Sequence, residues 1–371
     1  MGRERWDSAG RPVARASSGG YIPPRVAAPS PYPSSGSEPA ARAPLTPFAR
    51  FAWALVAYDV LVVAWGAYVR ATGSGAGCGR HWPLCNGEFV PCAPRVQTLI
   101  ELSHRLSSGG ALALTVGLLV WALVAYPRGH VVRRGAAVST GLMVAEALIG
   151  AGLVLFELVE HDASMKRALS ICLHLINTLL LLAATTLTAW WASGGARPRA
   201  RDHRALAWLT GAPLAAMFVV GASGAVTALG DTLFPSASLA AGLAQDLAPG
   251  AHLFVRLRAL HPVLAAATAA AVVITSGLVR ALRPTRSVRL LSRSAALLAV
   301  LQVGAGLLNV ALLAPVWMQL VHLVLADALW IALVLTSASA LAPDQPPISS
   351  SSGPAPISEV PPSSSSVAPV T

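Results

Sequence analysis

The chain has 371 residues, of which 54% are apolar and only 12% are charged, and its formal net charge is +11. Because a soluble domain carries about 25% charged residues, this composition excludes an ordinary soluble protein and indicates a polytopic membrane protein. The arginines lie in short gaps between apolar runs, which is typical of membrane orientation signals and excludes nucleic acid as a partner.

Eight apolar segments are long enough to cross a bilayer as helices, which takes roughly 20 residues each. They lie approximately at 48–70, 96–126, 134–157, 167–193, 205–229, 254–280, 290–314 and 316–341. We therefore expect an all-α integral membrane protein with eight transmembrane helices. Residues 1–47 and 342–371 are rich in Pro and Ser and bury too little apolar surface to fold, so both are expected to be disordered tails.

The charges of the gaps orient the chain in the membrane. The gaps after the second, fourth and sixth segments are rich in arginine, whereas the alternate gaps are acidic or nearly neutral. Because positively charged loops stay in the cytoplasm, we expect both termini in the cytoplasm and the loop that carries Cys78 and Cys85 outside. The expected localisation is the cell (inner) membrane, as a multi-pass protein.

Four histidines lie inside the apolar segments, one in each even-numbered segment: His104, His174, His261 and His322. Even-numbered segments all run from outside to inside, so the four imidazoles share one depth. A weak internal repeat supports the comparison of the two halves, since GAYVRATGSG at 66–75 aligns with GASGAVTALG at 221–230.

A polar side chain at membrane depth is costly and usually has a function. Two histidines on facing helices suit bis-axial ligation of a haem iron, which takes one nitrogen from each face of the macrocycle. The alternative is a hydrogen bond between helices at each histidine. Four histidines at matched depth in two repeats favour haem.

Glu101 and His104 are three residues apart on one helix face. A carboxylate one turn outward of a haem ligand can relay protons, or stabilise a developing cation during oxidation of a ring substituent. Arg105 would pair with Glu101 or with a haem propionate, and an ordinary ion pair at the helix entrance is the alternative. The second half places Arg258 three residues before His261, so we expect the chemistry in the first half.

The outward loop carries Cys78, Cys85 and Cys92. An oxidising compartment favours a disulfide there, and an exposed disulfide in a short loop is either structural or redox-active. A zinc site that adds His81 to these cysteines is a third alternative, although tetrahedral zinc sites use tighter cysteine spacing. Cys172 is expected to be a packing residue.

Several motifs together resemble one known family. They are VRATGSGAGC and WPLCNG within 69–87, ELSHR at 101–105, TALGDTLFP at 227–235 and LHP at 260–262, completed by His174 and His322. With them the sequence resembles haem A synthase, the CtaA-type membrane enzyme family of cytochrome oxidase biogenesis. The resemblance implies two pseudo-repeated four-helix bundles over 48–193 and 205–341, joined by a cytoplasmic linker at 194–204.

The resemblance also implies oxidation of a ring methyl of haem O to a formyl group, which gives haem A. Carried over residue by residue, the family pattern implies that His104 and His174 hold the substrate haem and that His261 and His322 hold the cofactor haem b. It also implies that Glu101 is catalytic, that Arg105 supports it and that Cys78 pairs with Cys85. Implied partners are haem O and the enzyme that supplies it, an electron donor, cytochrome oxidase assembly factors and a second copy of the chain.

Two departures from the family pattern bear on the mechanism. Some members carry a second cysteine pair in the second-half outer loop, but residues 231–251 contain none, and Cys92 is an additional cysteine able to compete for Cys85. Two other classes also fit the histidines: a bis-haem b-type membrane electron carrier and a haem handover factor. Neither needs Glu101, so the enzyme is favoured.

Overall fold

The structure is a computed structural model that describes residues 44–343. The two predicted tails therefore lie almost entirely outside the described residues. The described part of the chain folds into helices without a β-strand, and eight membrane spans are long and apolar enough to cross a bilayer. The predicted all-α, eight-span class is confirmed.

Seven of the predicted segments each form one long helix, with ends that differ by at most four residues from those predicted. They are α1 (Pro47–Ala71), α2 (Val96–Ala125), α3 (Val131–Leu155), α4 (Met165–Ala192), α5 (Arg204–Leu233), α9 (Arg286–Ala311) and α10 (Val316–Ala340). Polar caps start several of them: the side chains of Thr46, Ser164 and Thr285 each accept a hydrogen bond from a backbone N–H in the first turn.

The sixth predicted segment, 254–280, forms one membrane span, Leu253–Leu282, but it is not one continuous helix. The chain instead forms α7 (Leu253–Arg258) and α8 (Leu260–Leu282), which meet at Ala259. Pro262 explains the break, because it has no N–H to donate to the carbonyl of Arg258 and its ring would collide with that carbonyl in a continuous helix. A further short helix, α6 (Leu239–Leu247), lies in the preceding loop and has no counterpart among the predicted segments.

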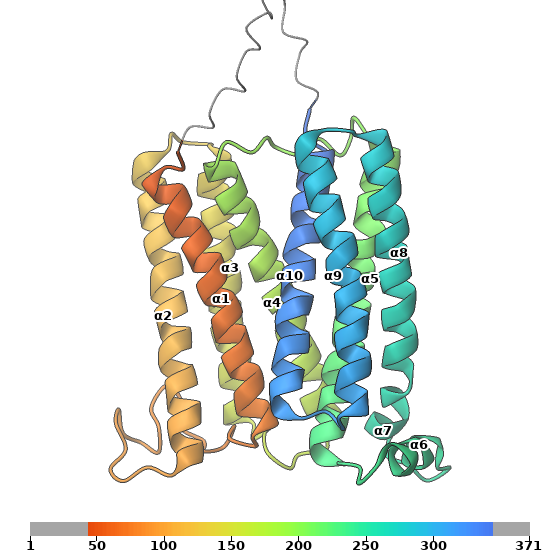
Figure 1. Ribbon diagram of the computed structural model, residues 1–371. Helices are drawn as coiled ribbons and strands as arrows, with labels where there is room; N and C mark the ends of the chain where they lie inside the picture. Colours follow the sequence, from red (N-terminus) through yellow and green to blue (C-terminus); the bar gives the residue numbers. More distant parts are fainter. Residues whose placement is uncertain (1–43, 344–371) are drawn as a thin grey trace, which may run out of the picture. The chain divides into compact units, whose positions relative to one another are not determined.

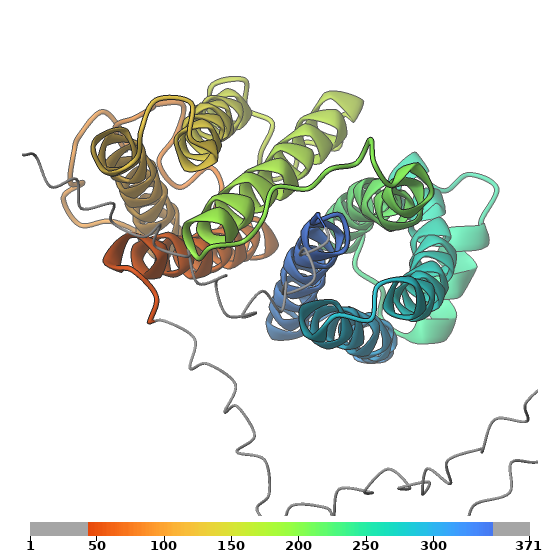
Figure 2. The ribbon, with the colours of Figure 1, turned by 90° about the horizontal axis from the view of Figure 1, so that it is seen from above.

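The long helices form two sets of four. In the first set α1, α2, α3 and α4 contact one another in order, and α1 closes the ring against α4; in the second set α5, α8, α9 and α10 do the same, with α5 against α10. Seen along the helices, the sets lie side by side (Figure 2). Contacts of α4 with α5 and α10, and of α1 with α10, join them.

The two ends of the helices differ in what they carry (Figure 1). One end holds the loop between α1 and α2, together with α6 and α7, and we call it the cysteine-loop end. The opposite end holds the loops at 126–130, 193–203 and 283–285, and we call it the arginine-loop end. All four histidines lie nearer the cysteine-loop end, because each is within the first ten residues of its helix.

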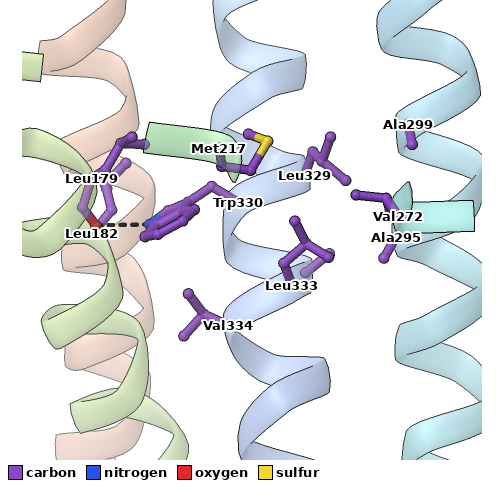
Figure 3. Packing of buried hydrophobic residues seen from close by; sticks show 11 residues of the cluster. Leu179, Leu182, Met217, Val272, Ala295, Ala299, Leu329, Trp330, Leu333 and Val334 are labelled. Atoms are coloured by element: carbon purple, nitrogen blue, oxygen red, sulfur yellow. Dashed lines mark hydrogen bonds between the residues drawn. The ribbon is translucent and has the colours of Figure 1, made fainter. Parts of the chain in front are cut away.

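A buried cluster packs across the boundary between the sets (Figure 3). It consists of Leu179, Leu182, Met217, Val272, Ala295, Ala299, Leu329, Trp330, Ala332, Leu333 and Val334. Nε1–H of Trp330 donates a hydrogen bond of 2.7 Å to the carbonyl oxygen of Leu179. Close packing and interhelical hydrogen bonds are the forces that hold helices together in lipid, so this cluster fixes the spacing of the two sets.

Large apolar side chains also remain on the outer surface of the helices. Leu61, Val124, Leu148, Leu278 and Leu297 are all exposed. Such a surface suits hydrocarbon, in which helices satisfy their own backbone polar groups. The chain is therefore a multi-pass membrane protein, and its orientation in the membrane stays a prediction.

Candidate functional site

Each of the four histidines packs against a glycine of the preceding long helix. The pairs are His104 with Gly66, His174 with Gly150, His261 with Gly224, and His322 with Gly306; a Cβ atom at each glycine would lie 2.9, 3.8, 2.9 and 3.1 Å from Cε1 of the imidazole. Three of these distances are shorter than ordinary van der Waals contact, so the glycines leave the space that the rings occupy. The same arrangement occurs in both sets.

These contacts correct the register of the internal repeat. The glycine that faces His261 is Gly224, whereas the sequence alignment pairs Gly66 with Gly221. Gly221 instead faces Leu175 and other side chains of α4. Matching the two glycines that face a histidine shifts the second half by three residues, which is nearly one helical turn.

The second set brings the rings of His261 and His322 close together in an edge-on arrangement. Their ring centroids are 6.5 Å apart and their planes are at 89°. Metal–imidazole bonds are about 2 Å long, so two imidazoles on opposite sides of one iron have centroids roughly 6 Å apart. The spacing in the second set fits a bis-histidine haem.

Hydrogen bonds at the two rings bear on which imidazole nitrogen is free to bind a metal. Oγ of Ser223 donates to the carbonyl of Val220 and also lies 3.0 Å from Nδ1 of His261, where the direction of the hydrogen bond depends on the tautomer of the ring. The amide nitrogen of Gln302 lies 3.3 Å from Nε2 of His322, and since an amide nitrogen only donates, this ring nitrogen is an acceptor. With the proton on Nδ1, each ring keeps on Nε2 the lone pair that a metal needs, and bound iron would replace the contact between Gln302 and His322.

In the first set, Nδ1 of His104 and Nδ1 of His174 both lack an aligned hydrogen bond within the described residues. Nδ1 of His174 is 3.3 Å from Oε1 of Glu146 on α3, a charge contact that is not aligned as a hydrogen bond. Buried nitrogens without partners, beside glycines that leave space, fit the insertion of a haem between these rings.

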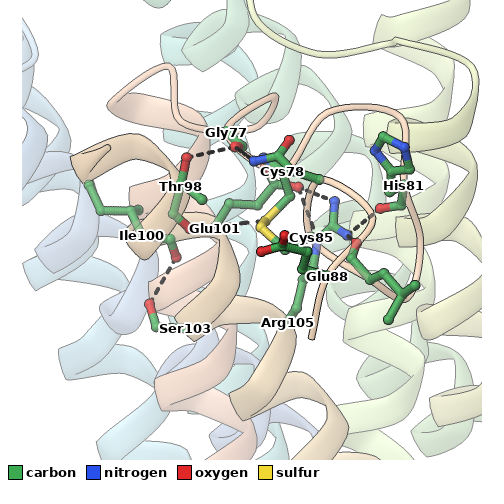
Figure 4. The surroundings of a disulfide bond; sticks show 12 residues. Gly77, Cys78, His81, Cys85, Glu88, Thr98, Ile100, Glu101, Ser103 and Arg105 are labelled. Carbon is green, nitrogen blue, oxygen red and sulfur yellow. Dashed lines mark hydrogen bonds and ion pairs between the residues drawn. A yellow bond between two sulfur atoms is a disulfide. The ribbon is translucent and has the colours of Figure 1, made fainter. Parts of the chain in front are cut away.

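The cysteine loop folds onto the start of α2 (Figure 4). Cys78 and Cys85 form a disulfide, and both are fully buried. Oγ1 of Thr98 donates to the carbonyl of Gly77 at 2.7 Å, and a Cβ at Gly77 would lie only 2.5 Å from the carbonyl oxygen of Gln97. A glycine is therefore required where the loop touches the helix.

This disulfide excludes one of the alternatives for the cysteines. It is the pairing that the resemblance implied, and Cys92 stays free and exposed. A zinc site built from Cys78 and Cys85 would need both as thiolates, so that alternative does not hold.

Glu101 is held in place by the loop that covers it. Its side chain is buried, with the residue 3% exposed. Backbone N–H of Cys78 donates to Oε2 at 2.7 Å, and Arg105 donates to Oε1 from Nε at 3.1 Å and from Nη2 at 2.5 Å. Nη1 of Arg105 also donates to the carbonyls of His81 and Leu84, at 2.5 and 2.6 Å. The guanidinium therefore clamps the loop and the carboxylate together.

The equivalent place in the second set holds a different device. Arg258 pairs with Asp231 of α5 at 3.1 Å and with Asp246 of α6 at 2.5 Å. These ion pairs fasten the short helix α6 to the end of the set. The residue one turn before His261 is therefore an arginine held in ion pairs, and not a carboxylate.

Two more carboxylates distinguish the first set, and both escaped the sequence analysis. Asp59 lies seven residues before Gly66, and the residue seven before Gly224 is Met217. In the same way Glu146 lies four residues before Gly150, and the residue four before Gly306 is Gln302. Asp59 is 3% exposed, and neither of its carboxylate oxygens has a hydrogen-bond partner within the described part of the chain. The signal in the sequence was a lone acidic residue inside an apolar segment.

Comparison with known proteins is consistent with this architecture. A model of the cytochrome oxidase assembly protein family matches residues 49–334. The chain belongs to that family, which confirms the CtaA-type resemblance. Family membership implies a haem-related substrate and cofactor.

Relatives of this family member carry two kinds of name. Proteins from two strains of Thermus thermophilus, each named "Protoheme IX farnesyltransferase", are 50% identical over 293 residues, which is 79% of this chain and 48% of theirs. A "Heme A synthase" from Bacillus mycoides is 44% identical over 110 residues, which is 29% of this chain and 35% of the relative. This family member thus spans about half the length of the Thermus proteins.

Proposed function

We propose that the chain is a haem A synthase, which oxidises a ring methyl of haem O to a formyl group for cytochrome oxidase. The observation that carries the proposal is the buried carboxylate of Glu101, held by Cys78 N–H at 2.7 Å and by Arg105, one turn from His104. Family membership and the Bacillus relatives support the same reaction.

The reaction sets what the site must do. Changing –CH3 to –CHO removes two hydrogens from the carbon, adds one oxygen and takes away four electrons. Water with an electron acceptor, or molecular oxygen with electrons from a donor, balances this change. The water route releases four protons together with the four electrons, so it needs a fixed proton acceptor beside the ring, whereas the oxygen route takes up protons with the electrons of the donor.

Glu101 is the residue placed to accept these protons, and its charge would stabilise a cation that develops at the methyl carbon. Arg105 and the N–H of Cys78 hold the carboxylate before substrate arrives, which removes the cost of orienting it. The disulfide acts here as a positioning element, because the peptide N–H that holds Glu101 belongs to Cys78.

The histidines would hold the two haems. His104 and His174 would ligate haem O as substrate, and His261 with His322 would ligate haem b, which supplies one-electron transfer when bound. Because the sets share a packed boundary, they hold the two sites at a fixed separation. The spacing of the second pair and the acceptor role of Nε2 in His322 support this assignment.

We also propose how the chain sits in the cell. The arginine-loop end and both termini would face the cytoplasm and the cysteine-loop end would face outward across the cell membrane. Proposed partners are the enzyme that supplies haem O, an electron donor, cytochrome oxidase assembly factors and a second copy of the chain. The farnesyl transfer to protohaem named for the Thermus relatives is chemistry that yields a farnesylated haem of the kind this site would oxidise.

The Thermus name also supplies a second candidate, transfer of a farnesyl group by this chain itself. That name belongs to proteins of which this chain covers 48%. The family model matches residues 49–334 of this chain, and the Bacillus relatives are named for haem A synthesis, so methyl oxidation is favoured.

The test is to produce the full chain in a host that makes haem O, purify it and identify the extracted haems. Haem A or its hydroxylated precursor supports the proposal. Haem b alone in both sites, although haem O is available, would overturn it in favour of an electron carrier or a handover factor. Production of haem O from protohaem and farnesyl diphosphate by the purified chain would establish the second candidate instead.

A further inference from the structure

We infer that Glu146 is a positioning residue of the first haem site, which orients His174 and makes its imidazole a stronger ligand. The inference rests on the proposed function in one respect, that His174 binds a haem iron. It assigns a role to a carboxylate that the oxidation chemistry at Glu101 does not use.

Glu146 is fixed beside His174 by two side chains of α4. Its Oε2 accepts a hydrogen bond of 2.6 Å from Nδ2 of Asn177, and its Oε1 accepts one from Oγ1 of Thr178. Asn177 also donates to the carbonyl of Leu142 at 2.9 Å. The carboxylate therefore has its position set by neighbours other than the histidine, as a positioning group requires.

The carboxylate lies on the side of the ring away from the ligating nitrogen. Oε1 is 3.3 Å from Nδ1 of His174, so a small rotation of the ring converts the contact into an aligned hydrogen bond. Nδ1–H then becomes the donor and Nε2 keeps the lone pair for iron. A carboxylate that accepts from a metal-bound imidazole fixes the ring and raises its basicity.

The second set shows that this carboxylate is not a general need of the scaffold. Glu146 and Gln302 both lie four residues before the glycine that faces the next histidine, Gly150 and Gly306 respectively. Gln302 presents a neutral amide near His322. The first haem therefore has a negative charge behind one ligand, and the second does not.

This difference predicts different redox properties for the two haems. Negative charge near the iron stabilises the ferric state, which carries one more positive charge than the ferrous state. The first haem should have the lower midpoint potential.

The alternative is that Glu146 only ties α3 to α4. Two variants separate the roles: Glu146→Gln keeps the size of the side chain and removes the carboxylate, whereas Thr178→Val removes one tie and keeps the carboxylate. Both are made in the full chain together with His322→Ala, which removes a ligand of the second haem. Haem b is the probe, and its dissociation constant and midpoint potential are measured with the unfolding temperature.

Loss of a hydrogen-bonded group behind a metal ligand typically weakens binding by about 10–100-fold, and we expect a loss of that size with a more positive potential for Glu146→Gln alone. Equal effects of Thr178→Val and Glu146→Gln would overturn the inference in favour of a structural tie, as would unchanged affinity and potential in Glu146→Gln. Failure of the His322→Ala parent to bind haem b at His104 and His174 would overturn the proposed function first, before either variant is compared.

Discussion

The two sets of helices share a scaffold and differ in charge. In both, a glycine on an odd-numbered span lies against each imidazole, and the same ring closure joins the four helices. The first set adds three carboxylates, at Asp59, Glu101 and Glu146. The corresponding residues of the second set are, in the same order, Met217, Arg258 and Gln302. One set carries carboxylates where the other carries apolar, cationic and neutral groups.

This comparison separates what holds a haem from what acts on one. Histidines and the glycines that make room for them are common to both sets, so we propose them as the parts that bind haem. Buried carboxylates are costly in a membrane; the second set lacks them at these three positions and buries one elsewhere, at Asp327 of α10. We propose that the chemistry belongs to the first set, and the substitutions that follow each remove a feature that the sets share or do not share.

The largest effect is expected from Glu101→Gln, which makes the first set resemble the second in charge. A positioned acid–base group contributes about 100–10,000-fold to a rate, so haem A formation should fall by that factor. Haem content should stay, because the carboxylate is not a proposed ligand. Extracted haems and absorbance spectra measure both.

Glu157→Gln is the matched control for this substitution, because its side chain is 58% exposed and pairs with Arg80 at the surface. It should leave haem A formation at the wild-type level. Normal haem A output from Glu101→Gln would remove that residue from the mechanism.

The next effect is expected from Cys78→Ser, which removes the disulfide found in the first set. The peptide N–H that holds Glu101 remains, but the loop that presents it is released. Loss of a native disulfide costs about 2–5 kcal/mol in small domains, so the unfolding temperature should drop and haem A formation should slow less than in Glu101→Gln. Chemical denaturation and turnover of the same sample measure the two quantities.

Cys92→Ser provides the control, because Cys92 is exposed and not in the disulfide. A Cys78→Ser protein with wild-type stability but no turnover would contradict a positioning role and point to electron transfer through the disulfide.

The sequence predicts the spans, the placement of the four histidines inside them and Glu101 as one of two partners of Arg105, because each has a local signal: hydropathy, a polar residue at membrane depth, or helical spacing. It fails for Glu146 because its partner Asn177 is 31 residues away on another helix. It fails for the repeat register because identities near Gly221 do not report which glycine faces His261. The break at Ala259 is a third kind of failure, since one proline overrides a continuous apolar pattern.

A smaller effect is expected where the sets are alike. Gly66→Ala and Gly224→Ala would each place a Cβ 2.9 Å from Cε1 of a histidine, and overpacking of this kind costs about 1–3 kcal/mol. Each should weaken the haem of its own set and leave the other haem in place. Gly150→Ala is the control, since its Cβ would lie at an ordinary 3.8 Å from His174. Haem stoichiometry resolved by spectrum measures the effect, and equal losses from all three variants would contradict the steric argument.

The smallest effect is expected at the boundary between the sets. Trp330→Phe keeps the aromatic ring against Phe218 but removes the hydrogen bond from Nε1 to the carbonyl of Leu179. A hydrogen bond contributes about 0.5–1.5 kcal/mol, so the unfolding temperature should fall slightly while both haems stay bound. A change in either haem spectrum would show instead that the boundary also shapes the haem sites, and that the two sets are less independent than their separate rings of helices indicate.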